Sequence, residues 1–398
     1  MELKAGYKQT EVGIIPEDWE IHAIGESMQL INGRAFKPSD WKDNGLPIIR
    51  IQNLNDAEAT FNYCSGYVED RHIIQSGDLL FAWSGTTGTS FGARVWNGET
   101  GVLNQHIFKV IPNQKKLTPE YTFLVLCKVQ EQIEKQAHGF KTSFVHVKKS
   151  DLIRVQLPFP PTKTEQTAIA TALSDTDALI NALDKLIAKK RQIKQGAMQE
   201  LLSGKKRLAG FSGEWEVKKL GDVANLINGR AYKLTEWETQ GTPVIRLQNL
   251  TGSDNYYFSQ LNLPAHQYCN FGDLLYMWSA TFGTHIWKGG KAIYHYHIWK
   301  VEPIKGFSDK NFLFHKFNEI TESLKQKSTN GGTMLHITKS FMENNEILFP
   351  PIEEQTAIAQ ILSDMDNEIA ALENKLAKIK NIKLGMMQEL LTGKTRLI

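Results

Sequence analysis

The fold is decided by residues 164–208, TEQTAIATALSDTDALINALDKLIAKKRQIKQGAMQELLSGKKRL, which return at 353–397 as EEQTAIAQILSDMDNEIAALENKLAKIKNIKLGMMQELLTGKTRL. The two segments align without a gap at an offset of 189 residues. A long match at one fixed offset is the sequence signature of an internal repeat. The chain is therefore expected to contain two copies of one structural unit.

The residues before each of these segments repeat as well. Their order is kept in both halves, while the offset between equivalent residues drifts by a few positions. Such drift is what insertions in surface loops produce, so each copy is expected to hold a globular domain followed by the conserved segment. The matching stretches are INGRAFK (31–37) with INGRAYK (227–233), PIIRIQNL (47–54) with PVIRLQNL (243–250), GDLLFAWSGTTG (77–88) with GDLLYMWSATFG (272–283), HIFKV (106–110) with HIWKV (297–301), and FPP at 159–161 and 349–351.

The conserved segments have the pattern of long amphipathic helices. Apolar or small residues recur at alternating steps of three and four, which is the seam of a helix that pairs with another helix. Double prolines at 160–161 and 350–351 mark the helix starts, and Gly204 and Gly393 stand where a C-terminal cap belongs. The predicted seam consists of Ile169, Leu173, Thr176, Ile180, Leu183, Ile187, Ile193, Ala197 and Leu201 in the first helix, and of Ile358, Leu362, Met365, Ile369, Leu372, Leu376, Ile379, Ile382, Met386 and Leu390 in the second.

The two helices are expected to pair with each other. Spanning 163–203 and 352–392, they would be roughly 55–60 Å long at ~1.5 Å per residue. If the second folds back along the first, the two form an antiparallel coiled coil that acts as a spacer, with a pseudo-twofold relation between the halves. EDWEIHAIGE (17–26) would then follow the end of the chain in space, as GEWEVKKLGD (213–222) follows the first helix in sequence. This arrangement is nearly cyclic.

The globular parts have the pattern of mixed α/β domains in which strands predominate. Short apolar runs such as GDLLFAW are broken by Gly, Asn and Asp, as strands and turns are, and helices are expected at 121–137 and 311–327. The predicted class is α+β: two mixed α/β domains separated by two long helices. The predicted boundaries are 1–160 for the first domain, 161–208 for the central helix, 209–350 for the second domain and 351–398 for the C-terminal helix.

The chain resembles the specificity subunits of Type I restriction-modification systems over essentially its whole length. The resemblance rests on the alternation of domains and helices, the PP-x(2,3)-EQ helix start (160–166 and 350–355), the QELL[ST]GK helix end (199–205 and 388–394) and the GDLL segment. It implies that each domain is a target recognition domain that reads one half of a bipartite sequence in double-stranded DNA. The helices would set the spacing of the two halves and dock two modification (methyltransferase) subunits.

The resemblance also implies where cofactors are used. The modification subunits would use S-adenosylmethionine to methylate adenine, and restriction (motor-nuclease) subunits would use ATP and Mg. No cofactor is expected in this chain. The main alternative is a tandem-repeat coiled-coil scaffold that binds only proteins, because most isolated heptad patterns belong to scaffolds or dimerisation helices.

Residues shared by both halves are candidates for DNA contacts that do not depend on sequence, because two domains reading different half-sites need different base readers. A repeated loop carries donors suited to phosphates or bases. For Arg50, Gln52 and Asn53, and their repeats, a place on the solvent side of a strand is the favoured interpretation over base contacts. The loop candidates are Asn32, Arg34 and Lys37 in one half and Asn228, Arg230 and Lys233 in the other.

Base readers are expected where the two copies diverge, at 86–104 against 281–296 and at 139–149 against 330–339. The recurring pairs His106/His297 and His146/His336 have apolar neighbours and are taken as structural. The candidates in the divergent stretches are Arg94, Asn104, Gln105, Lys141, Ser143 and Lys148 in the first half, and His285, Lys288, Lys291, His295, Tyr296, Thr333 and Lys339 in the second.

Composition bounds the remaining possibilities. The 398 residues are 41% hydrophobic and 22% charged, with a net charge of +3, which permits nucleic-acid binding but does not argue for it. The three cysteines are scattered, as in a protein of the reducing cytosol, and no apolar run is long enough for a membrane span or a signal peptide. We therefore expect a cytoplasmic protein that does not bind membranes.

Signals of catalysis are missing. No [ND]PP[FY] motif of an adenine methyltransferase is present, and the sequence shows no His/Cys cluster for a metal. GKT at 393–395 imitates a phosphate-binding loop, but the glycine required five positions earlier is Gln388. The chain is expected to be non-catalytic by itself.

Overall fold

The computed structural model describes residues 3, 5–56, 58–139, 143–328 and 336–397. It divides into two compact units, which are described separately. Unit 1 comprises Met1–Ala182 and Leu376–Ile398, and unit 2 comprises Leu183–Lys375. Each unit thus contains one globular domain, the first half of one long helix and the second half of the other.

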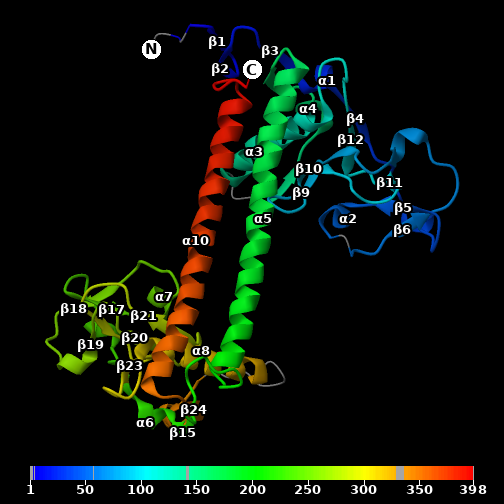
Figure 1. The fold of residues 1–398 in the computed structure, drawn as a ribbon. Coiled ribbons are helices and arrows are strands. Elements are labelled where there is room, and N and C mark those ends of the chain that lie inside the picture. The colour runs from blue at the N-terminus through cyan, green and yellow to red at the C-terminus, as the bar shows by residue number, and fades with distance from the viewer. Residues whose placement is uncertain (1–2, 4, 57, 140–142, 329–335, 398) are drawn as a thin grey trace. The chain divides into compact units, whose positions relative to one another are not determined.

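The domain of unit 1 is built on two four-stranded sheets (Figure 1). The sheet that we call central has the order β10-β8-β12-β4, and the sheet that we call outer has the order β6-β5-β11-β7. Its strands are β1 (Tyr7–Thr10), β2 (Gly13–Pro16), β3 (Glu20–Ala23), β4 (Met28–Asn32), β5 (Leu46–Ile49), β6 (Asn62–Cys64), β7 (Ile73–Ile74), β8 (Leu79–Ala82), β9 (Ser84–Thr86), β10 (Gly92–Val95), β11 (Gly101–Leu103), β12 (Ile107–Pro112), β13 (Phe144–His146) and β14 (Gln156–Phe159), and its helices are α1 (Ile24–Ser27), α2 (Ile51–Asn55), α3 (Pro119–Gly139) and α4 (Lys149–Leu152).

The domain of unit 2 repeats this topology. Its central sheet has the order β21-β20-β23-β16 and its outer sheet the order β18-β17-β22-β19. In both outer sheets one pair is parallel, β11 with β5 and β22 with β17. The elements are β15 (Glu216–Lys219), β16 (Ala224–Asn228), β17 (Thr242–Ile245), β18 (Tyr257–Ser259), β19 (Tyr268–Cys269), β20 (Leu274–Met277), β21 (Gly283–Ile286), β22 (Ala292–Tyr294), β23 (Ile298–Pro303), β24 (Glu346–Phe349), α6 (Leu220–Val223), α7 (Leu247–Leu250), α8 (Lys310–Ser328) and α9 (Lys339–Glu343).

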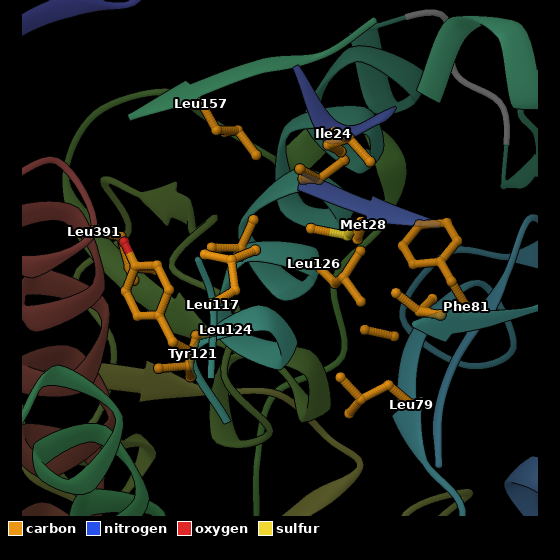
Figure 2. Packing of buried hydrophobic residues seen from close by; sticks show 14 of the residues in the cluster. Ile24, Met28, Leu79, Phe81, Leu117, Tyr121, Leu124, Leu126, Leu157 and Leu391 are labelled. Carbon is orange, nitrogen blue, oxygen red and sulfur yellow. The ribbon is translucent and has the colours of Figure 1, made fainter. Parts of the chain in front are cut away.

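In unit 1 the GDLL segment forms a tight turn followed by β8, an inner strand of the central sheet. Gly77 has a φ of 95°, and the carboxylate of Asp78 accepts a hydrogen bond of 2.7 Å from the amide of Gln75, so a tight turn precedes β8. Strand β8 then lies between β10 and β12 and is buried on both faces. Leu79 and Phe81 pack into the main core of unit 1, which also contains residues of α3 (Figure 2).

Leu80 and Ala82, on the other face of β8, pack into a second core with the outer sheet. A strand that is buried on both faces must read as a continuous apolar run, because no position of it faces water. The main core gathers residues from distant parts of the chain, including Tyr121 and Leu391, which Figure 2 shows with the other labelled side chains.

The two long helices are α5 (Lys163–Leu201) and α10 (Ile352–Leu390), and they pack together in each unit (Figure 1). In unit 1 the ammonium of Lys383 lies 2.6 Å from the carboxylate of Asp177, and Thr176 contacts Met386 at 3.6 Å. Going back along α5 from Asp177 to Glu165, the partner moves forward along the chain from Lys383 to Arg396. The two helices therefore run in opposite directions. The predicted antiparallel pairing is therefore confirmed.

Most of the predicted seam is at the helix contact. The fully buried members are Ile169 and Leu173 in α5 and Ile358 and Leu362 in α10. Helices 121–137 and 311–327 are also confirmed, as α3 and α8. Six further predicted seam positions are buried or half-buried: Ile180, Leu183, Ile187, Ile369, Leu372 and Leu376.

Two predicted seam residues are wrong. Ile193 is 46% exposed and Ile382 is 43% exposed. Their place at the helix contact is taken by the following residues, Lys194 and Lys383, whose ammonium groups pair with carboxylates on the facing helix, Asp366 for Lys194. A lysine can hold such a position because its aliphatic stem covers apolar surface while its charged end reaches a partner.

Both helix ends have the predicted glycine cap. Gly204 and Gly393 have φ values of 71° and 72°, the left-handed region that glycine adopts without strain. A Cβ at residue 393 would lie 2.5 Å from the ring of Pro16, so the helix end and the start of the chain are in close contact within unit 1.

After each glycine cap, an arginine pairs with a buried glutamate at the start of the other long helix. In unit 1 Arg396 donates to Glu165, with one contact of 2.8 Å, and to Asp18. In unit 2 Arg207 donates to Glu354 at 2.6 and 2.7 Å. The end of the chain thus packs beside its beginning in unit 1, as predicted.

The glutamine of each EQ pair is hydrogen-bonded within its own domain and to the residues just before its helix. Gln166 accepts from the amide of Thr118 at 3.0 Å and donates to the carbonyl of Pro160 at 3.3 Å. Gln355 accepts from the amide of Asp309 at 2.9 Å and donates to Pro350 at 2.8 Å. Each EQ pair therefore joins the start of a long helix both to its own domain, through glutamine, and to the end of the other helix, through glutamate.

Candidate nucleic-acid interface

The INGR motif and the turn that joins the two sheets lie together in unit 1. Asn104 and Gln105 form this turn between β11 and β12, and we call it the β11–β12 turn. The amide of Arg34 donates to the carbonyl of Leu103 at 2.7 Å. A Cβ on Gly33 would lie 2.1 Å from the carbonyl oxygen of Asn104, so only glycine permits this close approach.

Unit 2 has the same construction with different side chains. His295 and Tyr296 form the equivalent β22–β23 turn. The amide of Arg230 donates to the carbonyl of Tyr294 at 3.0 Å, and the amide of Tyr296 donates to the carbonyl of Arg230 at 3.0 Å. Gly229 is again required, since its Cβ would lie 2.3 Å from backbone oxygens of the turn.

A tryptophan supports each turn. The indole of Trp83 donates to the carbonyl of Gln105 at 3.1 Å, and that of Trp278 donates to the carbonyl of Tyr296 at 2.8 Å. Both indoles are half-buried at the edge of the core. Histidine rings surround them: His106 and His146 lie 5.3 and 4.8 Å from Trp83 by ring centroids.

The corresponding rings in unit 2 are His297 and His336, at 5.2 and 6.0 Å from the Trp278 ring. Ser279 also contacts Nδ1 of His336 at 3.1 Å. The recurring histidines therefore pack around the tryptophan, in line with the structural role expected of them. Burial lowers the pKa of His297, and burial with nearby His297 and Arg246 lowers the pKa of His295 to about 4.

The INGR arginines are less free than the sequence suggests. Arg230 forms an ion pair with Glu236, and this hydrogen bond lowers the pKa of the glutamate. Its guanidinium also lies 4.3 Å from the Tyr232 ring centroid. Arg34 donates to the carbonyl of Tyr67 at 3.4 Å. Arg230 in particular is neutralised within its own domain.

The interpretation of Arg50 and Arg246 as the solvent side of a strand is wrong. The strands end one residue earlier, at Ile49 and Ile245, and each arginine is the N-cap residue of a short helix, α2 or α7. The strand ends here because the side chain of the third residue of the short helix bonds back to the arginine amide; in unit 1 this is Asn53, at 3.0 Å.

The guanidinium of Arg246 lies between two aromatic rings, 5.6 Å from the centroid of Trp237 and 4.4 Å from that of Tyr257. Arg50 lies 5.4 Å from the Trp41 centroid. Nε of each arginine is buried and finds no hydrogen-bond partner in the described part of the chain. No ion pair of either arginine is found among the residues that the structure describes.

The neighbouring amides of the motif are structural. Gln52 donates to the carbonyl of Thr60 at 3.3 Å, and Asn53 donates to the carbonyls of Ala59 and Thr60. In unit 2 Gln248 and Asn249 bond to the following loop in the same way. The sequence signal that points to the arginines instead is the tryptophan nine residues before each, at the same spacing in both halves.

The other predicted residues are not gathered at these turns. Arg94 folds back onto the carbonyls of Ala93 and Thr89, at 2.7 and 2.6 Å, on β10 at the far edge of the central sheet from β4. His285 lies on the equivalent edge strand β21, and burial lowers its pKa. Lys291 covers the Tyr268 ring at 3.9 Å, and Lys339 pairs with Glu343 at 3.4 Å.

Several predicted residues are simply exposed at the surface. Lys37 and Lys233 are exposed beside short 3-10 helices, and Asn32 and Asn228 are exposed at the ends of β4 and β16. The side chains of Ser143, Lys148 and Lys288 are also exposed, whereas Lys141 and Thr333 lie outside the described residues.

Within the described part of the chain, no group of three or more His, Cys, Asp or Glu side chains is placed to hold a metal ion. Over the same residues, no helix is both long and apolar enough to cross a membrane.

Comparison with known proteins shows the family. The family model described as Type I restriction modification DNA specificity domain matches twice, over residues 16–195 and 212–381. Two proteins of Methanocaldococcus jannaschii are 27% identical to the chain: the putative type I restriction enzyme MjaX specificity subunit, aligned over 98% of this chain and 96% of its own, and the MjaVIII specificity subunit, over 96% and 94%.

Solved structures share the fold. The S subunit of a Type I restriction-modification system from M. genitalium matches with a TM-score of 0.57 at 15% identity, covering 98% of both chains. A chain from a structure of the type I R-M system that addresses complex assembly and conformational transition matches with a TM-score of 0.61 at 18% identity, covering 96% of this chain and 99% of its own. The comparisons favour DNA recognition over the scaffold interpretation. With both halves matched by the same model, the chain belongs to the Type I restriction-modification DNA specificity family.

Proposed function

We propose that the chain is the DNA-recognition subunit of a Type I restriction-modification complex and reads a bipartite target. Residues 1–160 read one half-site and residues 212–350 read the other. The observation that carries this proposal is the double family match on two domains of one topology, whose β11–β12 and β22–β23 turns carry different side chains. Two domains that read the same sequence would have no need to differ there.

In this proposal the helices set the spacing of the two half-sites. Linked readers gain affinity only where the target halves match the geometry of the link. Within each unit the packed helix halves are joined to the domain through a buried EQ pair. The outer faces of the helices, which carry exposed residues such as Leu186 and Leu384, are where two modification subunits would dock.

Catalysis belongs to partners in this proposal. Modification subunits supply S-adenosylmethionine chemistry on adenine, and restriction subunits supply ATP- and Mg-dependent cleavage. The chain itself acts in the cytoplasm, where the DNA substrate is, and contributes selection of the target. Its own residues provide hydrogen-bond donors, aromatic surfaces and unpaired guanidinium groups, which are the groups that nucleic-acid interfaces use.

Domain exchange tests the proposal. A chain in which residues 212–350 replace residues 1–160 is assembled with the modification subunits, and the methylated adenines are mapped by single-molecule sequencing. We expect a symmetric target in which the second half-site occurs twice as an inverted repeat. An unchanged asymmetric target would contradict the proposal. The parental chain, processed in parallel, is the control.

A gel shift against random and target duplexes tests the scaffold alternative directly. A scaffold gives no sequence-selective shift with or without the modification subunits. The proposed subunit gives a selective shift at least in the assembled complex.

A further inference from the structure

The two domains present different side chains on the same local frame. Around the turn, the frame consists of a glycine that a Cβ would disrupt, the supporting tryptophan and the arginine stacked on an aromatic ring. On this frame unit 1 places Asn104 and Gln105, whereas unit 2 places His295 and Tyr296. Variation confined to side chains on a preserved backbone is what two readers of different sequences require.

The backbone of the turn does not depend on these side chains. The amide of Asn104 donates to the carbonyl of Ile49 at 3.0 Å, and the amide of His295 donates to the carbonyl of Ile245 at 2.9 Å. The supporting indole also bonds to a backbone carbonyl of the turn. Exchange of the two side chains between units therefore leaves these bonds in place.

The polar atoms at the turn are not all satisfied by hydrogen bonds within the described part of the protein. Oδ1 of Asn104 is buried and has no hydrogen-bond partner among the described residues, an unusual state for an amide oxygen in a folded protein. In unit 2 a cavity of about 300 Å³ is lined by Trp237, Arg246, Leu247, Gln248, His295 and His297. With its pKa lowered to about 4, His295 is neutral near pH 7 and offers one donor and one acceptor.

Unlike the two turn residues, the arginine beside the turn is identical in both units: Arg50 in unit 1 corresponds to Arg246 in unit 2. Arg50 and Arg246 are each held on an aromatic face, and no carboxylate among the described residues neutralises them. A guanidinium fixed in this way is prepared for an anionic oxygen, and its planar fork matches a phosphate.

We propose that Asn104–Gln105 and His295–Tyr296 are the base-specifying positions of the two domains, and that Arg50 and Arg246 make the same phosphate contact beside them. The inference rests on the proposed function and names the site within each domain that carries it. Asn and Gln amides pair with the donor and acceptor edge of adenine in the major groove. Neutral histidine and tyrosine present a different pattern, so unit 2 reads a different base step.

Exchange of the turn residues tests the base-specifying role. The variant Asn104→His with Gln105→Tyr, in the full chain assembled with modification subunits, is compared with the parental complex by single-molecule sequencing of methylated adenines. We expect a changed half-site for residues 1–160 and an unchanged half-site for residues 212–350. The reciprocal variant, His295→Asn with Tyr296→Gln, should change only the other half.

The matched control is Gln114→Lys, which also introduces a unit 2 residue at an exposed site but lies at the opposite end of β12 from the turn. It should leave the target unchanged. If the turn variant methylates nothing, its melting temperature and its selectivity for the parental duplex over random DNA are measured. A folded variant that has lost this selectivity supports the proposal, and one that keeps it overturns the proposal. If the double variant does not fold, Asn104→His alone is carried through the same measurements.

The phosphate contact has a different signature. Arg246→Gln should weaken binding to all sequences and reduce the slope of log K against log salt by about 0.9, with the target unchanged. Arg246→Lys keeps the charge and should retain most of the slope. A changed target in Arg246→Gln, or an unchanged slope, would overturn this part of the proposal.

These outcomes separate the inference from the proposed function. If the domain exchange changes the target but the turn exchange does not, the inference fails and the proposed function stands. If the domain exchange also leaves the target unchanged, the proposed function fails.

Discussion

At the residue scale, the best-defined contacts are those of the arginines that follow the helix ends. Glu165 is only 2% exposed, and Arg396 is the cation that compensates its charge. The same hydrogen bonds raise the pKa of Arg396 and lower the pKa of Asp18. A buried carboxylate without its partner is costly, because the charge stays desolvated while the attraction is lost.

Removal of this arginine should therefore destabilise unit 1. We expect Arg396→Ala to cost about 3–5 kcal/mol of unfolding free energy, the range for breaking a buried ion pair from one side. Urea unfolding measures the change. Lys394→Ala, which removes an exposed cation two residues earlier, is the control and should cost less than about 0.5 kcal/mol. Equal effects of the two variants would contradict the assigned role.

A buried histidine makes unit 2 sensitive to acid. His315 is 1% exposed, its Nε2 lies 3.5 Å from Oγ of Ser363, and no described residue offers its Nδ1 a hydrogen bond. Burial, with a smaller effect of Lys194, lowers the pKa of His315 from 6.5 to about 4, against the opposing effects of Asp366 and Asp309. Below pH 6.5 the unfolded chain binds a proton that the folded chain does not bind, so stability falls as the pH drops from 6.5 to 4.

A side chain that stays neutral between pH 4 and pH 7 at this position provides the test. His315→Cys should remove one proton from the acid-linked unfolding, a difference on the order of 3 kcal/mol between pH 7 and pH 4. Unfolding free energies measured across this pH range give the proton difference directly. His295 remains in both proteins, so its own titration cancels. Parallel pH profiles for the two proteins would show that His315 is protonated in the folded state.

At the element scale, the ends of the long helices are specified more tightly than their middles. Gly393 has a left-handed φ and no room for a Cβ, whereas Gly385 lies within α10 with nothing within 4 Å of a Cβ placed on it. A glycine within α10 and a glycine just after its end, eight residues apart, thus have opposite requirements.

Alanine at these positions should act in opposite directions. Gly393→Ala should lower stability by more than about 1 kcal/mol, because the left-handed conformation is strained for alanine and Pro16 must move. Gly385→Ala should raise stability by up to about 1 kcal/mol, the difference in helix propensity between the two residues. Thermal melting of both variants measures the shifts. A rise in melting temperature for Gly393→Ala would mean that the cap is not required.

The lysines at the helix contact show what periodicity cannot decide. Ile193 and Lys194 are adjacent, and an apolar residue is the usual choice for a seam. Lys194 is 20% exposed and pairs with Asp366, while Ile193 faces outward. Lys383 with Asp177 repeats this choice in unit 1, so each unit places a lysine–aspartate ion pair at the helix contact.

At the scale of the whole molecule, the chain closes on itself within unit 1. The hydroxyl of Tyr7 donates to the carbonyl of Gly393 at 3.2 Å, and Arg396 reaches Asp18 at 2.8 Å. Leu390 and Leu391 complete the core to which Trp19 also belongs.

Circular permutation should therefore be tolerated. We expect a chain whose termini are joined by a short Gly/Ser linker, and which is opened at Gly210–Phe211, to keep its melting temperature within a few degrees. Its methylated target should be unchanged, because each domain keeps the same helix halves. An opening within α10, at Lys375–Leu376, is the control and should destabilise the protein, since it interrupts helical hydrogen bonds. Loss of the target in the first permutant would contradict the closed arrangement.

The sequence by itself determined the repeat, the two long helices, their glycine caps, their antiparallel return and the α3 and α8 helices. These features follow from local periodicity and from residues that act on their own backbone, and both are readable along the chain. Only the tertiary structure decided that Arg230 is neutralised while Arg246 is stacked on aromatic rings with no ion pair among the described residues, that Lys194 replaces Ile193 at the helix contact, and in which order the strands pair. Those outcomes depend on which distant groups meet, and burial and charge pairing between them leave no periodic trace in the sequence.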